Sequence, residues 1–262
     1  MKLAIISKYP ADTARLTPLL FVHGSLQGAW CWDVHFLNYF AAHGYAAHAV
    51  DLRGHGASEG REKLRWTRIA DYVDDVSVAA QQLTSPPILI GHSMGGFTTQ
   101  KYLETHAAPA AVLLSSPSPA GLLPTALRIA RRHPVAFART AVTRSLLPII
   151  ASPELAREAF FSKDLPGYAL ASYWRRMQDD SYRSFLDMVA LDLPHPRKLK
   201  APLLVLGVSR DNMLSAREIR ATARAYAAPS DIVADVAHNS MLELRWQAVA
   251  DRILAWLQQG NW

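Results

Sequence analysis

The residues with the clearest chemical meaning lie at positions 91–96, which read GHSMGG. An apolar run precedes this string and a helical pattern follows it, so the spacing predicts a sharp strand-to-helix turn with Ser93 at its tip. Glycines on either side of the serine let neighbouring backbone approach such a turn without a clash. We therefore expect the Ser93 hydroxyl to act as a nucleophile, with the backbone N–H of Met94 facing a developing oxyanion.

A serine hydroxyl becomes a nucleophile only with a general base, and the base needs an acid that orients it. Asp211 and His238 follow later apolar runs, so the chain order is serine, aspartate, histidine. This order predicts that His238 takes the proton of Ser93, while Asp211 fixes the imidazole tautomer and stabilises the imidazolium. The alternatives are an Asp211 that caps a helix and a surface His238 with structural hydrogen bonds.

A second oxyanion donor is expected near the end of the first apolar run, where His23 and Gly24 stand. We predict the backbone N–H of Ser25 as this donor, although the Ser25 side chain could instead cap the helix that follows. His23 is interpreted as a structural histidine. The polar string at positions 51–58 is interpreted as a turn beside the site.

Six short apolar runs precede these residues or alternate with them. Because both faces of each run are mostly apolar, they are typical of central parallel strands. They are Leu19–Val22, Tyr45–Leu52, Pro87–Ile90, Ala111–Leu114, Leu203–Val208 and Asp231–Val236. Helical patterns cover Trp30–Ala42, Trp66–Leu83, Gly95–His106, Ala216–Tyr226 and Leu242–Leu257. The alternation predicts an α/β fold with a doubly wound, mostly parallel sheet and a site at the carboxyl ends of its strands.

The alternation stops between residues 117 and 196, where prolines and short helical patterns dominate. We predict a sheet core formed by residues 1–116 and 197–262, with residues 117–196 inserted as a helical cap. Apolar cap residues would pack on the core and line a pocket above Ser93. Such a pocket favours hydrophobic acyl or aryl esters over sugars or peptides.

Composition excludes several classes of protein. Half of the 262 residues are hydrophobic and lysine plus arginine exceed aspartate plus glutamate by 28 − 22 = 6, a balance unlike that of a disordered chain. Cys31 is the only cysteine, so neither an intramolecular disulfide nor a cysteine-based zinc site is expected, and the ten scattered histidines indicate no other metal. No secretory signal or spanning segment is recognisable, which predicts a cytoplasmic protein.

Three arginines, Arg128, Arg131 and Arg132, share one face of a predicted helix. A solvated helix face is the favoured interpretation, and contact with an anionic membrane surface is the alternative. Nucleic-acid binding is not expected, because neither a recognisable module nor interleaved basic and aromatic residues are present.

Together these motifs resemble the α/β-hydrolase superfamily. The resemblance rests on FVHG at 21–24, DLRGHGAS at 51–58, GHSMGG at 91–96, Asp211 and AH at 237–238. The string at 51–58 and the histidine before Ser93 are similar to esterases, monoacylglycerol-type lipases and lysophospholipases. The resemblance implies a sheet of six to eight strands, a Ser-His-Asp triad, no cofactor, and a helical cap where residues 117–196 lie.

At some positions the sequence differs from particular families of α/β-hydrolases, and these differences narrow the expected activity. Ser93 stands where haloalkane dehalogenases and epoxide hydrolases carry an aspartate, and the residues after Gly24 differ from those of proline iminopeptidases. The stretch Ser25–Trp32 is similar to plant methylesterases and hydroxynitrile lyases, but the cyanide-handling lysine of the latter is not identifiable. We expect a serine hydrolase that cleaves a small-molecule ester. A carbon–carbon bond hydrolase or lactonase with the same triad, or a non-catalytic ligand-binding protein, are the alternatives. The oligomeric state is not predicted.

Overall fold

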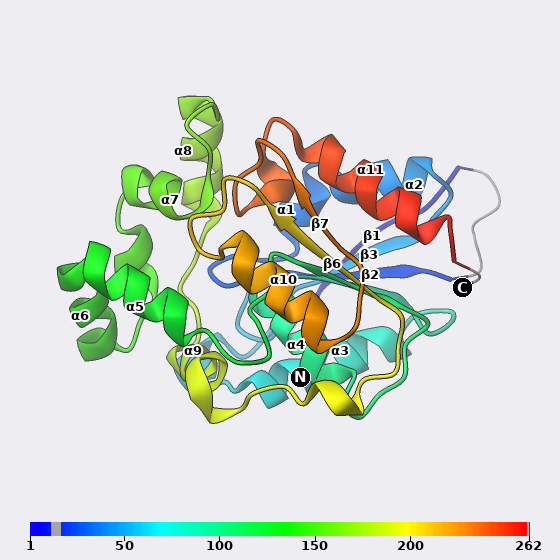
Figure 1. The fold of residues 1–262 in the computed structure, drawn as a ribbon, viewed down its shortest axis with the longest axis horizontal. Coiled ribbons are helices and arrows are strands. Elements are labelled where there is room, and N and C mark those ends of the chain that lie inside the picture. The colour runs from blue at the N-terminus through cyan, green and yellow to red at the C-terminus, as the bar shows by residue number, and fades with distance from the viewer. Residues whose placement is uncertain (12–16, 261) are drawn as a thin grey trace.

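The protein is described by a computed structural model that places residues 1–11, 17–260 and 262. Its centre is a seven-stranded sheet in the order β1-β3-β2-β4-β5-β6-β7 (Figure 1). The strands are β1 Ile5–Lys8, β2 Leu19–Val22, β3 Ala47–Val50, β4 Ile88–His92, β5 Ala111–Leu114, β6 Leu203–Val208 and β7 Ser230–Val233. All neighbouring strands run parallel except β1, which pairs antiparallel with β3. The predicted fold class is confirmed, with a strand number inside the predicted range.

Strands β2 to β6 are completely buried, because helices cover both faces of the sheet. Side chains of β4 alternate between these faces, so Ile88 and Ile90 belong to one apolar cluster and Leu89 to the other. The first cluster contains residues of α1 Trp30–Asp33, α2 Phe36–Ala42 and α11 Trp246–Leu257. The second contains residues of α3 Ile69–Gln81, α4 Met94–Tyr102 and α10 Ala216–Ala225. Burial on both faces is why these strands lack a simple hydrophobic alternation.

Three sequence expectations are corrected by the structure. Strand β1 was not among the six predicted runs, because it is a half-buried edge strand of only four residues. The predicted helix Trp30–Ala42 is two helices, since the backbone of His35 leaves the helical region at φ −139°. Two other predicted helices are shorter than expected: the helix predicted at Trp66–Leu83 is α3 Ile69–Gln81, and the one predicted at Leu242–Leu257 is α11, which begins at Trp246. The 3₁₀-helix η1 Arg61–Trp66 precedes α3, and η5 Ser240–Leu242 precedes α11.

Between β5 and β6 the chain forms helices and no strand. They are α5 Leu123–Arg132, α6 Pro134–Thr143, η2 Leu147–Ile150, α7 Pro153–Phe160, α8 Gly167–Arg176, α9 Tyr182–Leu186, the π-helix η3 Asp187–Leu191 and η4 Pro196–Lys198. Figure 1 shows α5 to α8 beside the sheet, at the left of the molecule. Side chains from this region, including Phe160 and Leu170, belong to the same apolar cluster as one face of the sheet. The division into core residues 1–116 and 197–262 and cap residues 117–196 stays a prediction.

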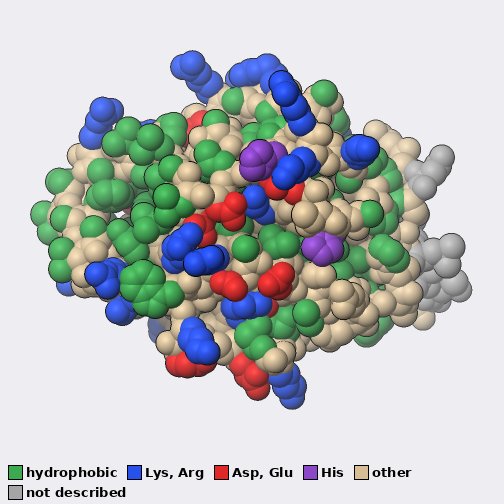
Figure 2. All heavy atoms as spheres, turned by 90° about the horizontal axis from the view of Figure 1, so that it is seen from below, with side chains coloured by type: hydrophobic (Ala, Val, Ile, Leu, Met, Phe, Trp, Pro, Cys, Tyr) green, Lys and Arg blue, Asp and Glu red, His purple; other side chains and the backbone are tan. Residues whose placement is uncertain are grey.

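Two of the three arginines on α5 form ion pairs within the molecule. Arg128 Nη2 lies 2.9 Å from Glu218 Oε2, and Arg132 pairs with Glu158. Figure 2 shows hydrophobic side chains gathered at the end of the molecule that α5 and α6 form, with Lys and Arg side chains at the margin. Contact of this end with a membrane surface stays a prediction. None of the described helices combines the length and apolar character needed to cross a bilayer.

Candidate active site

The predicted strand-to-helix turn at Ser93 is present. Ser93 follows β4 and precedes α4, with φ 51° and ψ −118°, a conformation that non-glycine residues rarely adopt. A Cβ at Gly91 would lie 2.4 Å from the Gly95 carbonyl oxygen, and a Cβ at Gly95 would lie 2.3 Å from the Val22 carbonyl oxygen. Both glycines are therefore needed for close backbone packing, and the turn projects the Ser93 hydroxyl beyond the end of the sheet.

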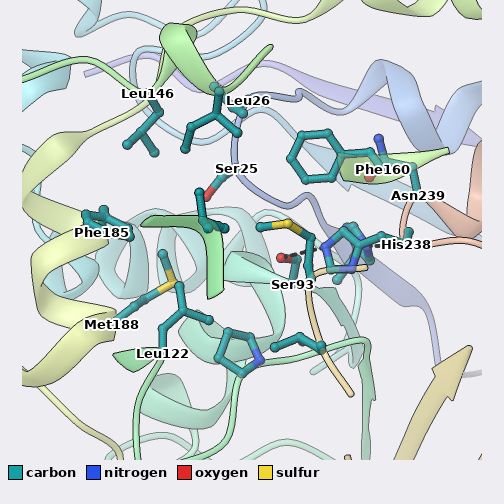
Figure 3. A pocket seen from close by; sticks show the side chains of 16 residues that line it. Ser25, Leu26, Ser93, Leu122, Leu146, Phe160, Phe185, Met188, His238 and Asn239 are labelled. Atoms are coloured by element: carbon teal, nitrogen blue, oxygen red, sulfur yellow. Dashed lines mark hydrogen bonds between the residues drawn. The ribbon is translucent and has the colours of Figure 1, made fainter. Parts of the chain in front are cut away.

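The structure brings the three predicted residues Ser93, His238 and Asp211 into one hydrogen-bonded chain. Figure 3 shows the part of this chain that joins Ser93 to His238. His238 Nε2 lies 3.1 Å from Ser93 Oγ, and His238 Nδ1 lies 2.8 Å from Asp211 Oδ2. Because a carboxylate only accepts, Nδ1–H donates to Asp211, and Nε2 accepts the hydrogen bond of the Ser93 hydroxyl. The side chains of His238 and Asp211 are 2% and 1% exposed, so water competes little for these bonds.

Backbone groups hold Asp211 in place. Its Oδ1 accepts hydrogen bonds from the N–H groups of Met213 at 2.8 Å and Leu214 at 2.9 Å. Its other oxygen is left to His238. The alternative role of Asp211 as a helix cap is not observed, because Ser215 caps α10 through a capping box with Glu218. These two backbone hydrogen bonds therefore orient the carboxylate towards His238.

His92, which the sequence did not single out as a functional residue, fixes the backbone of His238. His92 Nε2 donates to the His238 carbonyl oxygen at 2.9 Å, and the ring is completely buried. Burial, together with the nearby His238 ring, holds the pKa of His92 well below its usual range, so the imidazole is neutral and can serve as this donor. Its place beside Ser93 in the sequence was the available signal.

The predicted oxyanion donors Ser25 and Met94 lie next to each other. The Ser25 hydroxyl approaches Met94 Sδ at 3.3 Å, and Ser25 lines the same pocket as Ser93. Ser25 does not cap the following helix, whose N-cap is Ala29 without a side-chain hydrogen bond. Ser25 and the residue that follows Ser93 are therefore neighbours at the site, and the role of their backbone N–H groups as oxyanion donors stays a prediction.

His23 has the structural surroundings that its interpretation predicts. Its Nδ1 donates to the Gly24 carbonyl oxygen at 2.8 Å, and its Nε2 accepts from the Leu52 N–H at 3.2 Å. Burial, assisted by the charge of His55, lowers the pKa of His23 to about 4. A neutral ring with both nitrogens engaged joins the ends of β2 and β3 and has no lone pair left for catalysis.

The polar turn at 51–58 also uses its side chains for internal contacts. Asp51 accepts hydrogen bonds from the N–H groups of Ala29 at 2.6 Å and Ala57 at 3.0 Å, and Arg53 pairs with Asp75 at 2.7 Å. None of these side chains lines the pocket at Ser93. They hold the loops around the site rather than contacting a substrate.

The pocket above Ser93 is almost entirely apolar. Its walls are Leu26, Pro117, Leu122, Ile129, Leu146, Ile149, Phe160, Phe185, Met188, Met213 and Leu214, and its polar residues are Ser25, His92, Ser93, His238 and Asn239. Figure 3 shows apolar side chains on several sides of Ser93, with the Phe160 ring close to His238. Most of the apolar wall comes from residues 117–188, so the helices between β5 and β6 shape the pocket. Phe160 is one of the apolar residues of this segment that the sequence predicted to pack on the core or to line the pocket, and its ring lies 5.6 Å from that of His238.

Within the described part of the chain, no group of three or more His, Cys, Asp or Glu side chains is arranged to hold a metal ion.

Known proteins resemble this chain in sequence over part of its length and in structure over nearly all of it. The chain is 32% identical over 113 residues to a monoacylglycerol lipase of Mycolicibacterium smegmatis, a match that covers 41% of this chain and 40% of the lipase. The chain thus spans well under half the length of this relative, and the lipase's substrate is not transferred by the match.

Solved structures match over nearly the full length. A candidate non-heme bromoperoxidase, BpoC of Mycobacterium tuberculosis H37Rv, superposes with a TM-score of 0.80 at 22% identity, over 99% of this chain and 96% of that one. An enol-lactonase of Burkholderia xenovorans LB400 superposes with a TM-score of 0.70 at 20% identity, over 98% and 96%. At such identities the likeness shows the fold alone. The sequence profile described as Alpha/beta hydrolase family matches residues 19–252, and the chain belongs to that family.

Proposed function

We propose that this protein is a serine hydrolase that cleaves hydrophobic carboxylic esters through an acyl-enzyme. The observation that carries the proposal is the hydrogen-bonded chain from Ser93 through His238 to Asp211. The Ser93 end of this chain lines an apolar pocket. The names of the family's relatives, which include lipase and lactonase, support a reaction at an ester carbonyl.

In this proposal Ser93 Oγ attacks the ester carbonyl carbon while its proton moves to His238 Nε2. Asp211 stabilises the imidazolium that results, and the N–H groups of Ser25 and Met94 donate to the carbonyl oxygen as it becomes an oxyanion. The tetrahedral intermediate then expels the alcohol, which takes the proton from His238. Water, deprotonated by His238, next attacks the acyl-enzyme and releases the carboxylic acid and Ser93.

The apolar wall supports a hydrophobic ester as the substrate. A sugar or peptide in this pocket would lose hydrogen bonds to water, and the walls offer few replacements for them. A hydrocarbon acyl or aryl group loses none and gains the hydrophobic contribution of burial. Lactones, which are cyclic esters, and vinylogous diketones cleaved at a carbon–carbon bond remain the alternative substrates for the same triad.

The test is to measure turnover of p-nitrophenyl esters and labelling by a fluorophosphonate probe. Ser93→Ala should abolish both while the circular dichroism spectrum and melting temperature stay close to those of the wild type. Ser7→Ala is the matched control and should retain full turnover, because Ser7 lies on the edge strand β1 and does not line the pocket at Ser93. Labelling of Ser93→Ala at the wild-type rate would show that another residue is the nucleophile. A parallel assay with a lactone and a vinylogous diketone distinguishes the substrate classes, and a higher kcat/KM for the diketone would contradict the ester assignment.

A further inference from the structure

We infer that Asp180, which lies between α8 and α9, is a positioning residue for the oxyanion hole. Its carboxylate holds the backbone of the loop that presents the Ser25 N–H. This inference rests on the proposed function, because it concerns how one of the two oxyanion donors is kept in place.

The Asp180 carboxylate binds directly to that loop. Its Oδ2 accepts a hydrogen bond from the Leu26 N–H at 2.7 Å, across 154 positions of sequence. Its Oδ1 accepts from the Ser181 N–H at 2.6 Å and from the Tyr72 hydroxyl at 3.4 Å. The side chain is completely buried, so water cannot replace these donors.

Leu26 has a backbone conformation that needs such support. Its φ is +65°, in the left-handed region that leucine rarely adopts, and its side chain is buried in the pocket wall. Both of its backbone polar groups are held by one segment, because the Gln178 N–H donates to the Leu26 carbonyl oxygen at 3.1 Å. Loss of these two hydrogen bonds would let Leu26 relax towards negative φ. The backbone of Ser25, directly before Leu26, would then shift as well and move its N–H from the oxyanion site.

The segment 178–180 is itself fixed to the core. The side chain of Gln178 donates to the Gly54 carbonyl oxygen at 2.9 Å and accepts from the Gly56 N–H at 3.0 Å. His55, between these glycines, places its Nε2 3.4 Å from Asp180 Oδ2. The loops after β2 and β3 are therefore joined through one segment of the helical insertion, and the oxyanion donor depends on that segment.

Charge supports the same conclusion. Burial acts to raise the pKa of Asp180, but the facing His55 and the N–H groups of Leu26 and Ser181 outweigh it and hold this pKa below its usual range. Conversely, burial acts to lower the pKa of His55, yet the carboxylate of Asp180 raises it above its usual value. The Asp180 carboxylate thus carries a negative charge, which makes its hydrogen bond with the Leu26 N–H stronger than one between neutral groups.

A structural role alone would predict lower stability without a specific effect on the transition state. The test therefore measures kcat, KM and the inhibition constant of a trifluoromethyl ketone, whose hemiketal oxyanion occupies the oxyanion hole. We expect Asp180→Ala to lower kcat by tenfold to a hundredfold with KM within threefold, and to weaken the ketone by a similar factor. Asp180→Asn keeps an acceptor oxygen for the Leu26 N–H, so it should fall between Asp180→Ala and the wild type.

Asp187→Ala is the matched control. Asp187 is also a buried carboxylate of this insertion, pairs with Arg183 at 2.8 Å and accepts from the Ile69 N–H at 3.1 Å, but it does not contact the loop after β2. It should lower the melting temperature and leave kcat and ketone inhibition within twofold. If Asp180→Ala does not fold, Asp180→Asn decides alone, with an expected threefold to tenfold loss in both kcat and ketone affinity.

Unchanged kcat and ketone inhibition in the folded Asp180 variant would overturn the inference. Losses equal to those of Asp187→Ala would do the same. In either case, turnover by the wild type that disappears in Ser93→Ala would leave the proposed function standing. Absence of ester turnover and of ketone inhibition in the wild type would instead overturn the proposed function and this inference together.

Discussion

Asp211→Asn should remove nearly all activity while leaving the fold intact. The two oxygens of Asp211 have different partners: Oδ1 accepts from the N–H groups of Met213 and Leu214, and Oδ2 accepts from His238 Nδ1–H. Asparagine has one oxygen and one NH₂ group. The two backbone donors will take the oxygen, because the opposite orientation leaves both facing an NH₂ group, at a cost of roughly 1–3 kcal/mol for each unpaired donor.

The asparagine NH₂ then donates to His238 Nδ1, which must present its lone pair. The proton of the neutral imidazole moves to Nε2, the nitrogen that lies 3.1 Å from Ser93 Oγ. His238 consequently has no lone pair with which to accept the serine proton. In Ser-His-Asp triads the wrong tautomer lowers kcat by about 10⁴, and we expect a loss of that order here.

The assay is steady-state hydrolysis of p-nitrophenyl butyrate at pH 7.5, with the melting temperature measured in parallel. Asp235→Asn is the control, because Asp235 is an exposed carboxylate near β7 that pairs with Arg210 and does not contact the triad. It should retain wild-type kcat. A kcat for Asp211→Asn within tenfold of the wild type would refute the reasoning about the tautomer, and so would an equal loss in Asp235→Asn.

Three further predictions follow from individual contacts. Gly95→Ala puts a Cβ 2.3 Å from a carbonyl oxygen of β2 and should lower the free energy of unfolding in urea by about 1–3 kcal/mol, whereas Gly167→Ala, with no heavy atom within 4 Å of its Cβ, should not. The raised pKa of His55 means that its protonated form stabilises the fold below the unfolded-state pKa of about 6.5, and that this contribution is lost as pH rises through the higher folded-state pKa. Stability in urea should therefore fall between pH 6 and pH 9 in the wild type and fall less in His55→Gln; equal slopes would contradict the linkage. Ile149→Trp narrows the apolar pocket and should lower kcat/KM for octanoate more than for acetate esters, while Val142→Trp, at a position 83% exposed, should change neither.

Much of the sheet and of the reactive centre can be predicted from local pattern. All six apolar runs became strands, and five of them are buried. A strand buried on both faces needs apolar residues at nearly every position, and that need is visible in four to eight residues of sequence. Ser93 is identifiable for a similar reason, since the glycines on either side of it meet steric demands within one turn. Asp211 and His238 could be chosen because the order of residues along the chain determines which strand ends they follow.

Other features had no local signature. The edge strand β1 is half-buried, and its four residues resemble many apolar stretches that form no strand. His92 stands beside Ser93 in the sequence, but nothing local shows its hydrogen bond of 2.9 Å to the His238 carbonyl oxygen, a contact across 146 positions. The ion pairs of the α5 arginines likewise depend on Glu158 and Glu218, which reach them only in the folded chain.

The sequence by itself therefore determined the family, the order of strands and helices along the chain, and the identity of the candidate nucleophile, base and acid. The tertiary structure alone decided how these groups are held: that Asp211 is oriented by two backbone N–H groups, that residues 117–188 supply most of the pocket wall, and that Asp180 lies against Leu26. The physical reason is the separation along the chain between the residues that interact. Steric and hydrophobic demands within a strand or turn act between near neighbours in the chain, whereas the hydrogen bond of a buried carboxylate depends on which distant segment packs against it.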